Sequence, residues 1–370
     1  MSVISLAGRT RAVDIALVLG GGNALGAYHA GACHALYERG IEPGWIVGAS
    51  VGAVIGAILA GNPRERRLER VRDFWQQAAQ PDLGWPAGIA RRVRERYNAV
   101  HALAAVTLGR PGLFGRRFPG LWSILPWMPK DQALLDHAPL ARTLERLIDF
   151  DRLNGGEVHL AFVCIDLETG EEVWFDNRQD RIGPEHLLAT SAIAPLFPPV
   201  EIGGRLLADP GYVNNLPLDR LFTKPPARDL LAFAVDLYSL RHGRPQGLDA
   251  VLNRTQDILF ASHARRSVDF LRREQALRRQ LDPKSPPVTL MHLAYRAPDH
   301  ELAAKALDFS PASVRDRLAA GCHDMEQALA LLARQAPTRE PLLYLRPDSV
   351  AEDAGWTSTS SGSGPAAAQA

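Results

Sequence analysis

The sequence predicts an α/β fold with a mostly parallel central sheet. Short apolar stretches typical of buried strands occur at residues 14–20, 45–49, 158–166 and 230–235, and helical patterns follow several of them. Strands that alternate with helices form parallel sheets, because each helix carries the chain back to the same edge. The composition, 46% hydrophobic and 22% charged over 370 residues, is that of a globular protein.

The other segments extend this pattern. Residues 64–79 place Leu68, Val71 and Phe74 on one face, which predicts an amphipathic surface helix. From residue 81 to 130 the periodicity gives way to Pro, Gly, Trp and Arg, and we expect a lid-like insertion there. Further helices are expected at 139–150, 248–281 and 311–333, a short one that stops at Pro195, and further strands at 172–175 and 287–295.

Three regions follow from this pattern. Residues 10–240, including the lid-like insertion at 81–130, form the predicted core domain. Residues 241–345 form a mainly helical C-terminal region. Residues 346–370 end in SSGSGPAAAQA, a low-complexity sequence that predicts a disordered tail.

Charge and cysteine content exclude several classes of protein. Forty-two basic against 41 acidic residues give a net charge of +1, so we expect no nucleic-acid partner. Cys33, Cys164 and Cys322 form no CxxC pair, which argues against a zinc ribbon or a disulfide framework. The first dozen residues show no secretory signal pattern, and a cytoplasmic location, with possible peripheral membrane contact, is expected.

The uncharged stretch at 44–61, GWIVGASVGAVIGAILAG, permits two interpretations. Its 18 residues and its GxxxG steps are compatible with a membrane span. Its Gly and Ala content favours instead a strand, a tight turn at Ser50 and a helix, which is the interpretation we prefer.

That turn carries a GxSxG pentapeptide, Gly48 to Gly52. A serine at a sharp strand-to-helix turn needs small neighbours two residues before and after, so that strand and helix can pass closely. The helix N-terminus then directs free N–H groups towards the charge that develops near Ser50. The spacing predicts a nucleophile; a strand–helix crossing without catalytic function is the alternative.

Two more motifs surround this candidate nucleophile. Residues 20–26, GGGNALG, lack the Lys of a Walker loop and the GxGxxG of a dinucleotide site. We expect backbone N–H groups around Gly21, Gly22 and Asn23 to form an oxyanion loop. Asp209, in ADPGYVNN, is a candidate base, although an ordinary Asp-Pro-Gly turn would look the same.

In this order and with their surroundings, LGGGNALGAYHAG, GASVG and DPGYVNNLP resemble the patatin-like phospholipase family over residues 14–240. The resemblance implies a three-layer α/β/α sandwich and a Ser50–Asp209 dyad. It also implies hydrolysis of acyl esters of lipids or phospholipids, without metal or cofactor. The particular lipid, the acyl position, and whether storage polyesters are substrates are left open.

Two positions depart from the family pattern. Leu25 stands where the family usually has Arg or Lys, and Pro210 stands where it usually has Gly. The first removes a cation from the oxyanion loop, and the second restricts the backbone at Asp209.

Alternative functions therefore stay open. An α/β-hydrolase triad would need a histidine after the acid, and five are available by order: His242, His263, His292, His300 and His323. A non-catalytic lipid-binding protein on a degenerate core is the other alternative.

Residues 111–130 interleave aromatic and cationic side chains. Phe118, Trp122 and Trp127 are candidate substrate-binding or bilayer-contacting residues of an interfacial lid. Packing of these rings against the edge of a core is the alternative. The oligomeric state and the role of residues 241–345 are open.

Overall fold

A ten-stranded sheet forms the centre of the molecule. The computed structural model describes residues 2–6, 9–80, 91–224, 226–335 and 340–347. The sheet has the strand order β12-β11-β10-β2-β3-β6-β9-β8, with β1 on β2 and β7 on β6. Its strands are β1 (Ser2–Leu6), β2 (Arg9–Leu19), β3 (Trp45–Ala49), β6 (His159–Asp166), β7 (Glu172–Asp176), β8 (Val200–Ile202), β9 (Arg205–Ala208), β10 (Leu230–Asp236), β11 (Val288–Ala294) and β12 (Leu342–Leu345).

The six strands from β12 to β6 run parallel, and β1, β7, β8 and β9 add antiparallel pairs at the margins. In β2, Leu17 and Leu19 point into one apolar cluster, whereas Ala16 and Val18 point into another. A parallel strand buried on both faces is a continuous apolar run, as IALVL is. The sheet therefore has a core on each side.

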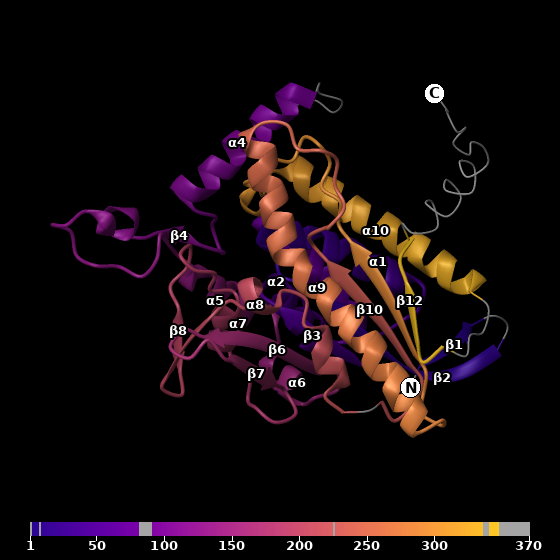
Figure 1. Cartoon of the computed structure of the whole chain (residues 1–370). Coiled ribbons are helices and arrows are strands. Elements are labelled where there is room, and N and C mark those ends of the chain that lie inside the picture. The colour runs from indigo at the N-terminus through magenta and orange to yellow at the C-terminus, as the bar shows by residue number, and fades with distance from the viewer. Residues whose placement is uncertain (1, 7–8, 81–90, 225, 336–339, 348–370) are drawn as a thin grey trace, which may run out of the picture.

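Helices cover both faces. They are α1 (Ala27–Glu38), α2 (Val51–Ala60), α3 (Arg67–Ala78), α4 (Arg91–Leu108), α5 (Ala138–Leu147), α6 (Phe150–Asn154), α7 (Pro184–Thr190), α8 (Gly211–Asn214), α9 (Leu248–Leu281) and α10 (Pro311–Arg334). Helices α1, α2, α3, α5 and α10 contribute to the larger core, and α9 contributes to both cores. In Figure 1, α9 crosses the near side of the sheet. The predicted α/β class with a mostly parallel sheet in three layers is confirmed.

Short 3₁₀ segments complete the chain: η1 (Asn23–Gly26), η2 (Arg64–Arg66), η3 (Gly120–Ile124), η4 (Leu218–Phe222) and η5 (Lys305–Leu307). The predicted helix over 64–79 corresponds to η2 and α3, and the strand at 287–295 to β11. The short helix expected before Pro195 already ends at Thr190.

The insertion contains more structure than its composition suggested. Arg91–Leu108 forms helix α4, although no clear apolar stripe marks it in the sequence. Beyond it, β4 (Gly115–Arg116) pairs with β5 (Leu135–Asp136) at the base of a loop that projects from the body (Figure 1). The first ten residues of the insertion, 81–90, lie outside the described residues, as does the predicted disordered tail from residue 348 onward.

The stretch at 44–61 is divided between β3 and the ten-residue helix α2. Within the described part of the chain, none of the helices has both the length and the apolar character that crossing a bilayer requires.

Helices α1 and α10 pack backbone to backbone through two glycines. A Cβ at Gly31 would overlap the carbonyl oxygen of Leu318, and a Cβ at Gly321 would overlap that of Tyr28. The two helices can approach this closely only because neither position carries a side chain. Helix α10 therefore packs directly against the backbone of α1.

We expect Gly31→Ala to lower the free energy of unfolding by about 3 kcal/mol, because the added methyl group meets rigid backbone. Denaturant unfolding monitored by circular dichroism measures this. Gly243→Ala is the matched control, since a Cβ at Gly243 meets nothing within 4 Å. Equal stability of the two variants would contradict the proposed close packing.

Candidate active site

Ser50 occupies a strained turn between β3 and α2. Its φ of 53° and ψ of −127° lie outside the regions that a residue with a side chain normally adopts. The turn is possible because Gly48 and Gly52 have no side chains. A Cβ at Gly48 would lie 2.5 Å from the Ala53 nitrogen, and a Cβ at Gly52 would overlap the Leu19 carbonyl oxygen. The backbone from Gly48 to Gly52 thus forms a tight turn, which we call the elbow.

The strand register brings Asp209 to the same place. Strands β3 and β9 border the same edge of β6, where Ala49 pairs with Val163 and Ala208 pairs with Ile165 in the antiparallel sense, and β7 lies on the opposite edge. The next residue of each strand, Ser50 and Asp209, is therefore level with Cys164. Two residues that are 159 positions apart in the sequence meet because both follow the end of a strand that borders β6.

Asp209 is buried and incompletely hydrogen-bonded. Its Oδ1 accepts a 2.7 Å hydrogen bond from the Gly211 N–H, while Oδ2 is buried without a hydrogen bond of good geometry. Burial raises the pKa of Asp209 to about 6, against the smaller lowering effects of the Ser50 hydroxyl and the Gly211 N–H. A carboxyl group with this pKa, next to a serine hydroxyl, can accept a proton near neutral pH.

The Gly-rich loop lies directly against Ser50. A Cβ at Gly21 would lie 3.1 Å from Ser50 Cβ and 2.5 Å from Asn215 Oδ1, so only glycine fits there. The Gly21 N–H, however, already donates to the Asn215 carbonyl oxygen at 3.0 Å, contrary to our expectation that it is free. In the described part of the chain, the N–H groups of Gly22 and Asn23 have no such acceptor, and Asn23 has a φ of 51°.

The fully buried Arg317 of α10 fixes this loop through a hydrogen bond to its backbone. Its Nη1 donates to the Ala24 carbonyl oxygen at 3.2 Å, and its Nε donates to Glu301 Oε1 at 2.8 Å. Asp308 Oδ2 lies 3.9 Å from Nη2. Because two carboxylates neutralise the guanidinium, Arg317 holds the loop in place rather than adding net positive charge to the site.

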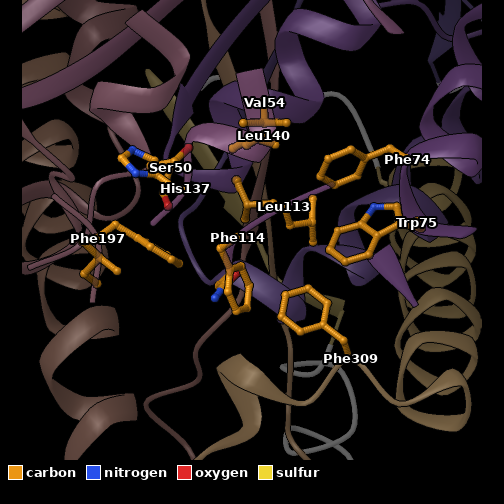
Figure 2. Close-up of a pocket in the computed structure, with 14 residues that line it drawn as sticks. Ser50, Val54, Phe74, Trp75, Leu113, Phe114, His137, Leu140, Phe197 and Phe309 are labelled. Carbon is orange, nitrogen blue, oxygen red and sulfur yellow. The ribbon is translucent and has the colours of Figure 1, made fainter. Parts of the chain in front are cut away.

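Beside Ser50 opens a narrow cavity of about 60 Å³ with apolar walls (Figure 2). Leu113 and Phe114 of the insertion and Phe197 and Phe309 enclose it, together with residues of α2, α3 and α5. Its full lining is Asn23, Ser50, Val51, Val54, Phe74, Trp75, Leu113, Phe114, His137, Leu140, Ser191, Ile193, Phe197 and Phe309. A hydrocarbon chain is the ligand that such walls favour.

His137, which sequence reasoning missed, also lines this cavity. Its Nε2 donates to the Leu188 carbonyl oxygen at 3.2 Å, and its Nδ1 is buried without a partner. Burial lowers the pKa of His137, so the ring is neutral at pH 7. No motif marks this residue; only the folding of α5 against α7 brings it to the site.

The structure does not bring the remaining candidates to Ser50. Phe118, Trp122 and Trp127 do not line the cavity; they are 78%, 60% and 76% exposed on the projecting loop. Five histidines considered for a triad are also absent from the lining of this cavity: His242, His263, His292, His300 and His323.

Comparison with known proteins identifies the family of the chain. The family profile described as patatin-like phospholipase matches residues 17–222, more than half of the chain. The chain belongs to the patatin-like phospholipase family. A second profile, described as patatin phospholipase, matches residues 280–340. The family resemblance seen in the sequence is thereby confirmed.

Relatives within the patatin-like family include larger proteins. The chain is 30% identical over 211 residues to the Caenorhabditis elegans patatin-like phospholipase domain-containing protein ZK370.4, covering 55% of this chain and 12% of that protein. It is 27% identical over 247 residues to lysophospholipase NTE1 of Kluyveromyces lactis, covering 65% and 14%. The chain thus spans only a small part of these curated relatives.

Two solved structures are similar to the chain at low sequence identity and low TM-score. VipD of Legionella pneumophila shares 14% identity, with a TM-score of 0.40, over 87% of this chain and 67% of VipD. Human GIVD cytosolic phospholipase A2 shares 14% identity, with a TM-score of 0.31, over 60% and 42%.

We expect the rate at which a fluorophosphonate modifies Ser50 to rise with pH and reach half its maximum near pH 6. Asp209 accepts a proton only when ionised, and burial raises its pKa to about 6. The rate should fall about tenfold per unit below pH 6 and level off above pH 7.

Rapid-quench labelling from pH 4.5 to 8 gives this profile. His137→Gln serves as the comparison, because His137 is a titratable side chain that lines the cavity beside Ser50. If the half-maximum of the labelling rate near pH 6 disappeared in His137→Gln, the titrating group would be the histidine instead of Asp209.

Proposed function

We propose that the protein is a serine hydrolase of lipid acyl esters, with Ser50 as nucleophile and Asp209 as base. The observation that carries this proposal is the placement of the Ser50 hydroxyl beside a buried carboxyl group of raised pKa, at one end of an apolar cavity. Membership of the patatin-like phospholipase family supports lipid hydrolysis.

In the first half of the reaction, Ser50 Oγ attacks the ester carbonyl carbon while its proton passes to Asp209. Collapse of the tetrahedral intermediate breaks the bond to the alcohol, which takes the proton from Asp209 as it leaves. The acyl group is then esterified to Ser50. In the second half, water loses a proton to Asp209 and attacks the acyl carbon; as the tetrahedral intermediate collapses, that proton passes from Asp209 to Ser50 Oγ and the fatty acid is released.

Negative charge on the tetrahedral intermediate needs hydrogen-bond donors that are already in place. The N–H groups of Gly22 and Asn23 are available in the described structure. The first turn of α2, which begins at Val51, presents further N–H groups without intrahelical acceptors. Donors fixed by a rigid backbone stabilise this charge without reorganisation during the reaction.

The cavity suits the acyl part of the substrate. Rings of Phe114, Phe197 and Phe309 line the cavity and exclude water from the acyl chain. Exclusion of water strengthens the hydrogen bonds to the oxyanion.

The departures at Leu25 and Pro210 are compatible with this proposal. Pro210 begins the short helix α8, and the Gly211 N–H holds the Asp209 carboxyl group. Leu25 is completely buried in the core, and Arg317 anchors the neighbouring carbonyl group of Ala24. These contacts favour the dyad over a degenerate, non-catalytic core.

We further propose peripheral contact with a lipid surface through the projecting loop. Phe118, Leu121, Trp122, Ile124 and Trp127 are between 59% and 78% exposed, and the loop stands out from the body (Figure 1). Large apolar side chains gathered on one protruding segment insert favourably into the headgroup region of a bilayer. Exposed Arg116 and Lys130 at its base can meet lipid phosphates.

Fluorophosphonate labelling read by intact mass tests the dyad. We expect one adduct on the wild-type protein, none on Ser50→Ala, and labelling slowed at least about 100-fold in Asp209→Asn, because a general base is lost. Release of fatty acid from phosphatidylcholine vesicles should follow the same order.

Full-rate labelling of Asp209→Asn would contradict the assignment of the base. Absence of an adduct on well-folded wild-type protein would favour a lipid-binding protein without catalysis.

Co-sedimentation with phosphatidylcholine–phosphatidylglycerol vesicles tests the loop. Replacing Trp122 and Trp127 together by Ala should weaken partitioning at least about tenfold, since two exposed rings lose their apolar contact. The control is Leu167→Ala, which truncates an exposed apolar side chain in the turn between β6 and β7. Unchanged sedimentation of the double variant would exclude the loop as the contact.

A further inference from the structure

Helix α9 carries apolar side chains on two sides. Its inner side, including Ala264, Val268 and Leu271, packs against the smaller core. On its outer side lie six large apolar residues that remain 45% to 88% exposed: Leu248, Leu252, Leu259, Phe270, Leu277 and Leu281. We call these six residues the outer stripe.

The outer stripe extends from one end of the helix to the other. Successive members are separated by 4, 7, 11, 7 and 4 residues. At about 100° per residue, these separations keep all six side chains within a sector of about 60°. The helix is about 51 Å long at 1.5 Å per residue, so the stripe runs its full length. A seam with these spacings is typical of a helix that pairs with another helix.

The order of these separations is the same whether they are counted from the N-terminus or from the C-terminus of the helix. The midpoint of the helix lies between Ala264 and Arg265. Each member of the stripe has a second member at the same distance on the other side of this midpoint. The pairs are Leu248 with Leu281, Leu252 with Leu277, and Leu259 with Phe270. A two-fold interface requires this property, because residue i of one copy must face residue j of the other while j faces i.

We propose that the outer stripe joins two copies of this chain into a two-fold dimer through antiparallel pairing of their α9 helices. Every apolar member of the stripe then faces an apolar member of the partner copy. Near the two-fold axis the stripe is interrupted by Ser262, His263 and Arg266. Small and polar side chains there specify the antiparallel register, since a shifted register would bury them against leucine.

The exposed area is sufficient for such an interface. The six side chains leave an area on the order of 700 Å² per copy accessible, near the ~800 Å² per partner of a standard stable interface. Val251 and Ile258, 46% and 47% exposed, flank the stripe and add to it.

The position of α9 favours a second copy over a bilayer as the occupant. The helix connects β10 to the parallel strand β11, so it runs from the edge of the sheet that holds Ser50 to the opposite edge. In Figure 1 it lies along the side of the sheet, whereas the loop after β4 projects from one end. A bilayer that meets this loop therefore leaves most of the outer stripe uncovered.

Light scattering coupled to size-exclusion chromatography gives the first test. We expect wild-type protein at micromolar concentration to have twice the chain mass of 40.4 kDa. Leu259→Glu with Phe270→Glu should give a folded monomer, because a carboxylate at 259 would face a carboxylate at 270 of the partner copy at two symmetric places in the seam. The matched control is Val100→Glu with Leu103→Glu, two residues of α4 that are 61% and 63% exposed, which should remain dimeric.

Disulfide trapping tests the antiparallel register in a Cys322→Ser background, in which the remaining Cys33 and Cys164 are buried. Leu259→Cys with Phe270→Cys should cross-link two copies on oxidation, because position 259 faces position 270 of the partner copy. Each single variant should fail to cross-link, since equivalent positions lie about 16 Å apart along the paired helices.

Three results would overturn the proposal. The first is wild-type protein that stays monomeric up to about 100 µM. If the Leu259→Glu, Phe270→Glu variant of this monomer also lost vesicle binding, the outer stripe would contact lipid instead of a second copy. The second is a dimer that survives these substitutions. The third is efficient cross-linking of the single variants, which would indicate parallel pairing. None of these measurements depends on enzymatic activity.

Discussion

The backbone turn at Ser50 is the constraint on which the candidate site depends. A serine with a φ of 53° is conformationally costly, and the surrounding packing must hold it. Gly48 and Gly52 make that packing possible, because α2 could not approach β3 and the end of β2 if either carried a side chain. The same approach brings the first turn of α2 beside the Gly-rich loop. Nucleophile, helix terminus and loop are thus consequences of one close contact.

The side chains around this turn are mainly apolar. Asp209 has one good hydrogen bond and an apolar environment, an arrangement that is unfavourable for a carboxylate but suitable for a base. The cavity that Ser50 lines has aromatic walls, among them Phe114 from the insertion and Phe309 from the C-terminal region. Segments far apart in the sequence therefore build the apolar walls beside Ser50 together.

Local patterns predicted most of this arrangement. Continuous apolar runs identified β2, β3, β6 and β10, and the spacing of Gly48, Ser50 and Gly52 identified the elbow, because both signals are carried by neighbouring residues. The use of the Gly21 N–H by Asn215 was not predictable, since it depends on how two distant loops pack. His137 was missed for the same reason. Helix α4 was missed because its apolar residues are scattered and several of them are exposed.

The contact between Arg317 and Ala24 links residues that are 293 positions apart. A ribosome synthesises the Gly-rich loop early and the anchoring guanidinium near the end of the chain. Until α10 has emerged, the loop lacks the hydrogen bond that fixes it, and α1 lacks the helix that packs on Gly31. The fixed position of the Gly-rich loop beside Ser50 therefore depends on residues that are synthesised late in the described part of the chain.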